Sequence, residues 1–157
     1  MDISVGRATM EDLEQLVELR LAYLTEDFGM LTPDQAVQIR EELPGYLQRH
    51  LGWDLHAYVA RLEDGVIVSC AWLLQVEKPP SPRFPNGRTG VLFNVYTDSS
   101  HRRKGLARRT MGMLIQGAYE LKLDVLELHA TEDGYPLYRS LGFSDDSSTH
   151  VAMRMML

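Results

Sequence analysis

The sequence lacks several features that would place it in other protein classes. It contains a single cysteine, Cys70, so no internal disulfide can form, and this favours a reducing compartment. No stretch approaches the roughly 20 apolar residues of a membrane span, and the first residues have no signal-peptide pattern. The net charge of −6 disfavours general nucleic-acid binding. We therefore expect one cytoplasmic domain over residues 1–157, with neither nucleic acid nor a membrane as its partner.

Three common ligand motifs are also missing. The chain has no G-x-G-x-x-G fingerprint of dinucleotide-binding folds and no G-x-x-x-x-G-K-[ST] P-loop. Its five histidines show no ligand spacing such as H-E-x-x-H. Two large nucleotide-binding classes therefore lose support, and no metal is expected.

Apolar periodicity predicts a mixed α/β fold. Helical spacing indicates four helices, near residues 12–29, 33–47, 105–121 and 135–141. Strand patterns indicate six strands, near residues 3–8, 56–63, 66–77, 91–98, 124–130 and 151–157. The strand–helix–strand order after residue 91 predicts two parallel strands. Pro44 is expected to kink or split the second helix, and the proline-rich segment 78–90 to form a functional or mobile loop.

The most informative segment runs from an apolar strand into a basic turn that opens a helix. The strand 91–98 is followed closely by Arg102-Arg-Lys-Gly105-Leu-Ala107. Backbone N–H groups of such a turn and of the helix start converge on an anion, and Gly105 permits a positive φ or a close approach. The pattern predicts a site for a phosphorylated ligand, although solvated helix starts also carry it.

A second motif, Leu137-Tyr138-x-x-x-Gly142-Phe143, follows the next predicted strand. Together with Arg102-x-x-Gly105-x-Ala107, it resembles the signature of the GNAT superfamily of N-acetyltransferases, and the resemblance covers most of the chain. It implies a GNAT fold, in which a twisted mixed sheet of six to seven strands with splayed central parallel strands is flanked by about four helices. It also implies transfer of the acetyl group of the cosubstrate acetyl-CoA to a primary amine on a small molecule or peptide, by direct attack in a ternary complex.

The resemblance also assigns binding roles. A bulge in the strand 91–98 would leave main-chain groups free to pair with the pantetheine arm of acetyl-CoA, at Val95, Tyr96 and Thr97. The pyrophosphate would bind the motif that starts at Arg102, through the main-chain N–H groups of Arg103, Lys104, Gly105, Leu106 and Ala107. A basic side chain, Arg108 or Arg109, would bind the ribose phosphate.

Two residues carry the predicted chemistry. Tyr138 would give a proton to the leaving thiolate, and the alternative is a buried tyrosine packed against Phe143 with its hydroxyl bonded locally. His129 is a candidate base for the acceptor amine, with a structural histidine as the alternative. Further candidates for the base are Asn94, Asp98 and Glu26.

Other interpretations remain open at this point. A non-catalytic acyl-CoA-binding sensor or interaction module would keep the phosphate site without transferring anything. An RNA-binding patch is disfavoured because residues 102–109 include no aromatic residue. The N-terminal helices and the loop 78–90 are expected to determine the acceptor. The terminal strand 151–157 makes a homodimer possible.

Overall fold

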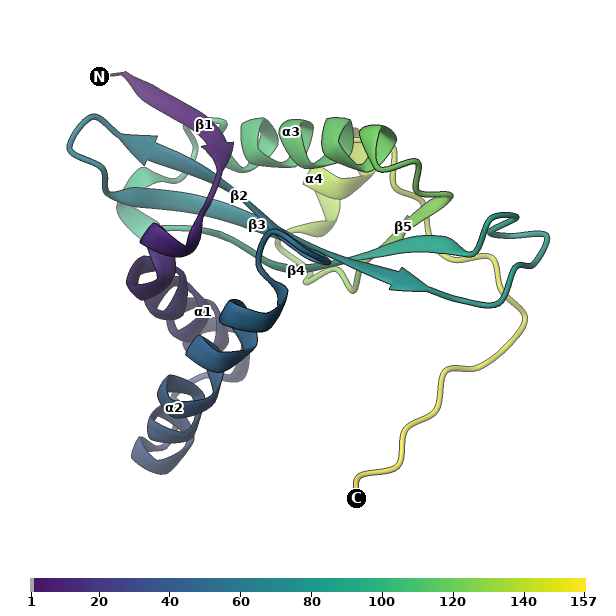
Figure 1. The fold of residues 1–157 in the computed structure, drawn as a ribbon, viewed down its shortest axis with the longest axis horizontal. Coiled ribbons are helices and arrows are strands. Elements are labelled where there is room, and N and C mark those ends of the chain that lie inside the picture. The colour runs from purple at the N-terminus through teal and green to yellow at the C-terminus, as the bar shows by residue number, and fades with distance from the viewer. Residues whose placement is uncertain (1) are drawn as a thin grey trace.

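The computed structural model describes residues 2–157 as one mixed sheet with helices on both faces (Figure 1). The sheet order is β1-β2-β3-β4-β5, with strands β1 Ile3–Arg7, β2 Leu55–Leu62, β3 Ile67–Glu77, β4 Arg88–Thr97 and β5 Val125–Glu127. The α-helices are α1 Leu13–Phe28, α2 Pro33–His50, α3 Leu106–Glu120 and α4 Tyr135–Ser140, and the 3-10 turns are η1 Met10–Asp12 and η2 Ser99–His101. Neighbours from β1 to β4 are antiparallel, whereas β4 and β5 are parallel as predicted.

The sheet separates two apolar layers. Side chains alternate along β2 and β3, so that Ala57, Val59 and Cys70 pack toward α1 and α2. Tyr58 and Ala71 pack on the opposite face, against α3. Figure 1 accordingly shows α1 and α2 on one side of the sheet and α3 and α4 on the other.

Capping boxes precede both N-terminal helices. Thr32 caps α2, whose first residue is Pro33, and Thr9 caps the 3-10 turn η1 that leads directly into α1. Pro44 was expected to kink or split α2, and it does not split it, because the helix is continuous from Pro33 to His50. A proline removes one backbone donor, and the remaining bonds and the buried Leu47 keep this helix together.

The predicted sixth strand does not form, so the sheet has fewer strands than the six to seven expected. Residues 151–157 have no secondary structure among the described residues, and their side chains are exposed. β5 is also shorter than the predicted 124–130. A strand requires a hydrogen-bonded neighbour, and the terminal segment runs away from the sheet instead of pairing with β5 (Figure 1).

The proline-rich segment extends the β3–β4 hairpin. The Lys78 N–H donates to the Gly87 carbonyl at 2.8 Å, and the Asn86 side chain donates to Asp124 at 2.9 Å. This loop lies at the opposite end of β4 from the turn after Thr97 (Figure 1). It is therefore remote from the predicted phosphate site. No helix in residues 2–157 combines the length and apolarity needed to cross a membrane.

Candidate active site

The parallel pair β4–β5 separates after a short contact. The two strands pair only at Thr89–Val125, Gly90–Leu126 and Val91–Glu127. Residues 92–97 of β4 have no partner on the β5 side within the described chain. One half of the pair is closed and the other half is an open sheet edge, which can pair with an extended, amide-bearing ligand.

A bulge at Asn94 coincides with this opening. Trp72 of β3 opposes Phe93 and Cys70 opposes Tyr96, so two residues of β4 face one residue of β3. Asn94 has a φ of 51° and is buried. Its carbonyl accepts a bond from the Cys70 thiol at 3.3 Å, and its amide donates to the Leu19 carbonyl at 3.4 Å. The structure thus has the bulge and the splay that the GNAT resemblance implies.

The turn before α3 presents free backbone donors. Arg103 and Gly105 have positive φ values of 63° and 73°. No hydrogen bond from the N–H groups of residues 103–108 occurs anywhere in residues 2–157, and the first bond of the helix comes from Arg109 N–H to the Gly105 carbonyl. These six N–H groups lie at the N-terminal end of a 15-residue helix, whose dipole favours an anion there.

Arg102 has a structural contact that its motif position does not reveal. Its Nε donates to the Thr97 carbonyl at 2.9 Å, and its Nη2 pairs with Glu26 at 2.6 Å. The guanidinium carbon also lies 5.6 Å from the centre of the Tyr96 ring. The Arg102 side chain therefore connects the turn to β4 and to α1. One of the two lone pairs of the Thr97 carbonyl accepts the bond from Arg102, which leaves the other for a ligand. The neighbouring Arg108 bonds Ser140 of α4 at 2.5 Å.

Tyr138 lies on α4 with a free hydroxyl. Its ring packs edge-on against Phe143, with centroids 6.0 Å apart. The hydroxyl makes no hydrogen bond within residues 2–157. Burial, together with the phenol of Tyr23, raises the pKa of Tyr138 to about 12. Tyr138 thus packs against Phe143, as expected for a purely structural tyrosine, but its hydroxyl lacks the local hydrogen bond that such a tyrosine would make.

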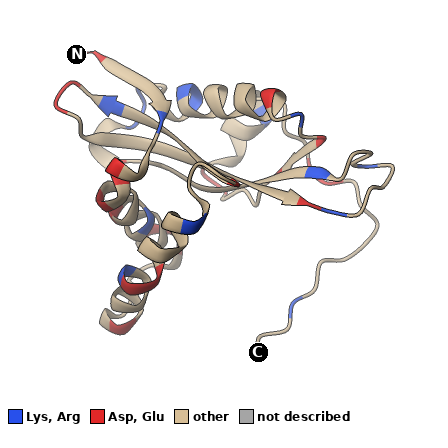
Figure 2. Ribbon diagram, viewed as in Figure 1, with Lys and Arg blue, Asp and Glu red and all other residues tan. Residues whose placement is uncertain are grey.

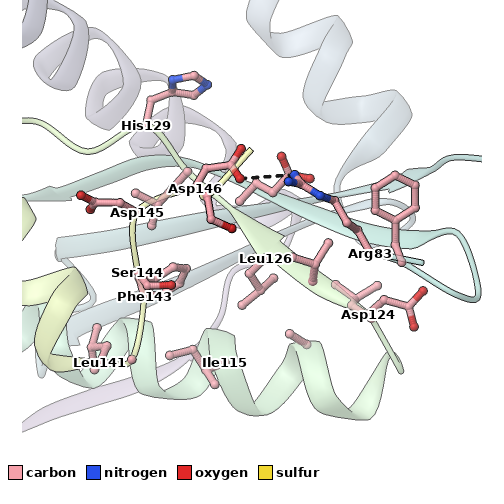
Figure 3. Close-up of a pocket in the computed structure, with 18 of the residues that line it drawn as sticks. Arg83, Ile115, Asp124, Leu126, His129, Leu141, Phe143, Ser144, Asp145 and Asp146 are labelled. Atoms are coloured by element: carbon pink, nitrogen blue, oxygen red, sulfur yellow. Dashed lines mark hydrogen bonds and ion pairs between the residues drawn. The ribbon is translucent and has the colours of Figure 1, made fainter. Parts of the chain in front are cut away.

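The structure does not bring His129 into one pocket with Tyr138. His129 is exposed beyond the end of β5 and lines a groove on the outer side of that strand (Figure 3). α3 and residues 141–147 form the other walls, and the Arg83–Asp146 ion pair of 3.3 Å crosses the groove. Tyr138 is not among the residues that line it.

The other candidate bases are engaged. Asp98 caps η2, and bonds from Ser100 and His101 lower the pKa of its carboxyl. Glu26 pairs with Arg102, and the Asn94 amide holds the bulge. Cys70 is fully buried, and burial raises the pKa of its thiol to about 12, which agrees with a core role and not with a nucleophile.

Sequence reasoning missed Arg20. The apolar spacing of α1 at Leu13, Leu16, Val17 and Leu24 places residue 20 on the same inward face. A cation at such a position is uncommon, so the periodicity itself contained the signal. Asn94 carried a similar signal, because asparagine is depleted in strands but tolerates a positive φ.

The comparison with protein families decides the assignment. The model of the acetyltransferase (GNAT) family matches residues 13–143, which is most of the chain. This protein belongs to the GNAT family. The match spans both motifs, from α1 through the turn at Gly105 to Phe143. No match was found among curated proteins.

Solved structures of similar fold cover nearly the whole GNAT chain. A predicted acetyltransferase from Clostridium acetobutylicum, solved with acetyl-CoA, is 23% identical with a TM-score of 0.82, covering 98% of this chain and 96% of its own. A GCN5-related N-acetyltransferase from Ralstonia eutropha JMP134 is 25% identical with a TM-score of 0.77, covering 97% and 99%. A ribosomal-protein-alanine N-acetyltransferase from Brucella melitensis biovar Abortus 2308 is 21% identical with a TM-score of 0.71, covering 98% and 100%.

Proposed function

We propose that this GNAT protein transfers the acetyl group of acetyl-CoA to a primary amine by direct attack in a ternary complex. The observation that carries the proposal is the juxtaposition of an open β4 edge with six unbonded N–H groups at residues 103–108. A diphosphate matches the donors of the turn, and an amide-bearing arm matches the strand edge. Both chemistries occur in the single cosubstrate acetyl-CoA.

The donors of the turn suit a diphosphate for a further reason. Gly105 has a φ of 73°, and the space where a side chain would project is open. A phosphate can therefore approach the backbone closely, as at other glycine-bearing helix starts. Lys104 and Arg103 add positive charge to the turn of an otherwise acidic protein.

Tyr138 supplies the proposed donor to the leaving group. The amine nitrogen attacks the thioester carbon to form the C–N bond, the C–S bond then breaks, and the products are an amide and a thiol. The charge that develops on sulfur is stabilised by a hydrogen bond from the Tyr138 hydroxyl, which is free for this purpose and protonated at neutral pH. The Val95 N–H on the open edge is the proposed donor to the oxyanion of the tetrahedral intermediate.

The proton of the attacking amine must also be removed. His129 is the proposed base, and it acts through water because its side chain is exposed and lines a groove that does not include Tyr138. The variant His129→Gln tests this assignment through the pH profile of kcat. Loss of the acidic limb supports the role, whereas an unchanged profile assigns the proton to another carrier.

Calorimetry and thiol release together test the proposed function. We expect acetyl-CoA and desulfo-CoA to bind the wild-type protein with about micromolar affinity or better, and a panel of amines to release thiol in the presence of acetyl-CoA. Absence of acetyl-CoA binding would overturn the proposal. Binding without turnover on aminoglycosides, polyamines, amino acids and peptide N-termini would favour the non-catalytic acyl-CoA-binding module.

A further inference from the structure

The inward face of α1 carries a cation without an acidic partner. Arg20 is half-buried, and its sequence neighbours Leu19 and Leu21 are buried. No carboxylate forms an ion pair with its guanidinium within residues 2–157. Charged groups that leave water are normally paired, so this position requires an explanation.

Three acidic residues of the same region pair with other arginines. Asp12 binds Arg61 at 2.9 Å, and Glu26 binds Arg102 at 2.6 Å. Glu18 pairs with Arg40 on the exposed side of α1. Asp27 favours the charged form of Arg20 but forms no ion pair with it. Arg40, Arg61 and Arg102 therefore each have a carboxylate partner, whereas Arg20 has no ion pair within residues 2–157.

The contacts that Arg20 does make leave most of its donors unused. Its Nη1 donates one long bond of 3.4 Å to the side-chain oxygen of Asn94. The guanidinium carbon lies 5.9 Å from the centre of the Tyr23 ring. A guanidinium has five N–H donors in a planar fork that suits the two oxygens of a carboxylate or phosphate. Most of that fork is available.

These contacts locate Arg20 at the open half of the sheet. Asn94 lies in the bulge of β4, in the segment beyond Val91 that no longer pairs with β5. Tyr23 is close enough to Tyr138 for its charge to raise the pKa of that phenol. Tyr46 of α2 is a further neighbour of Arg20. Burial raises the pKa of the Tyr46 phenol, and the charge of Arg20 partly opposes this rise. The cation therefore lies on the α1 side of the sheet, beside the bulge in the open half of β4.

We infer that Arg20 binds an oxyanion group of the acceptor, so that the preferred substrate is an amine that also carries a carboxylate or a phosphate. The inference rests on the proposed transferase function and names its acceptor class. The anion of the acceptor compensates the charge of Arg20, and Asn94 and Tyr23 hold the guanidinium in place. A neutral amine would leave the cation uncompensated and would bind more weakly.

A panel of matched acceptors tests the inference by thiol release. Glycine is compared with glycinamide, and phosphoethanolamine with ethanolamine, so that each pair differs in the oxyanion and the two pairs distinguish carboxylate from phosphate. We expect kcat/KM for at least one anionic acceptor to exceed that of its neutral counterpart by about 10- to 100-fold. Arg20→Gln should reduce this ratio toward one through KM, with the affinity for acetyl-CoA unchanged.

Two variants control for structural effects. Arg20→Lys keeps the charge without the planar fork and should retain part of the preference. Arg40→Gln removes an exposed arginine paired with Glu18 and should leave the preference intact. An equal ratio in wild type and Arg20→Gln, with both proteins folded by circular dichroism, would overturn the inference. So would a wild-type preference for the neutral acceptors.

A binding measurement separates failure of this inference from failure of the proposed function. If no acceptor is turned over, acetate and inorganic phosphate are titrated into the ¹⁵N-labelled protein. The Arg20 side-chain N–H signal is identified by its loss in Arg20→Lys. A saturable shift of this signal would support an oxyanion site at Arg20 even without catalysis, and no shift with either anion would reject the site.

Discussion

The two halves of the β4–β5 pair have opposite properties. At Thr89–Val91 the strands are paired, and Gly90 lies so close to Leu73 and Leu126 that an added Cβ would meet them at 2.6 and 2.9 Å. Beyond Val91 the edge of β4 is open, and Asn94 and Gly105 adopt positive φ values next to unbonded N–H groups. The closed half supplies packing, and the open half leaves backbone groups available to a ligand. Substitutions in the two halves should therefore affect stability and binding separately.

The largest expected effect is on binding at the open half. Gly105→Glu should weaken acetyl-CoA binding by about 100-fold or more, because a carboxylate at the turn repels phosphate and obstructs several donors worth about 1.5–3 kcal/mol each. Calorimetry measures this loss. The matched control is Gly52→Glu, since Gly52 has a similar φ of 85° and equally open surroundings. Equal affinity in wild type and Gly105→Glu would contradict the account.

The next effect concerns catalysis at the same half. Tyr138→Phe should lower kcat by about 100-fold with nearly unchanged acetyl-CoA affinity, because it removes a donor to the leaving thiolate and keeps the packing against Phe143. Since the pKa of Tyr138 is about 12, wild-type kcat should show no decline from its ionisation below about pH 11. Steady-state kinetics over pH tests both statements, and undiminished kcat in the variant would remove the assigned role.

Stability should respond at the closed half. Gly90→Ala should destabilise the fold by about 1–3 kcal/mol, because the methyl group overpacks the contact with Leu73, Leu123 and Leu126. Denaturant titration measures the change, and acetyl-CoA affinity of the folded protein should be retained. Gly6→Ala in β1 is the control, because no atom lies within 4 Å of its added Cβ. An equal loss of unfolding free energy in Gly90→Ala and Gly6→Ala would show that close packing around Gly90 does not cause the destabilisation.

The smallest effect on folding is expected at the C-terminal end. Residues 151–157 are almost fully exposed, and Figure 2 shows this segment without charge except for one basic position, Arg154. Truncation after His150 should change the unfolding free energy by less than about 0.5 kcal/mol. The exposed apolar segment and the unpaired edge of β5 also predict self-association, which truncation should abolish in analytical ultracentrifugation. A truncated protein that sediments like the wild type would contradict this prediction.

The sequence was sufficient where the structure follows from local patterns. Apolar periodicity predicted α1, α2 and the strands β2 and β3, and Gly105 predicted the donor turn. The strand predicted at residues 151–157 did not form. Alternating polarity indicates that a segment can be a strand, but it does not show whether a neighbouring strand is available to pair with it. Loop 78–90 was likewise expected from the GNAT resemblance to help determine the acceptor, and its position at the far end of β4 depends on tertiary structure.

The backbone features of the candidate site were predicted from the sequence, whereas some of its side-chain contacts were not. The turn at 103–108 and the edge at 92–97 follow from the strand, the bulge and the helix start. The contact of Arg102 with Glu26 joins residues 76 positions apart, and no local pattern predicts it. The cation on the inward face of α1 was visible in the periodicity, but its lack of a partner required the packed structure.

The most direct test of the central claim follows backbone amide signals during a titration with acetyl-CoA. Two-dimensional ¹H–¹⁵N spectra should show shifts at residues 103–108 and 92–97 that saturate together, whereas Thr89–Val91 remain nearly unchanged. This result would confirm that the open half of the β4–β5 pair binds the ligand and that the closed half only supports it. Shifts confined to the groove outside β5, or the absence of any shift, would contradict the account.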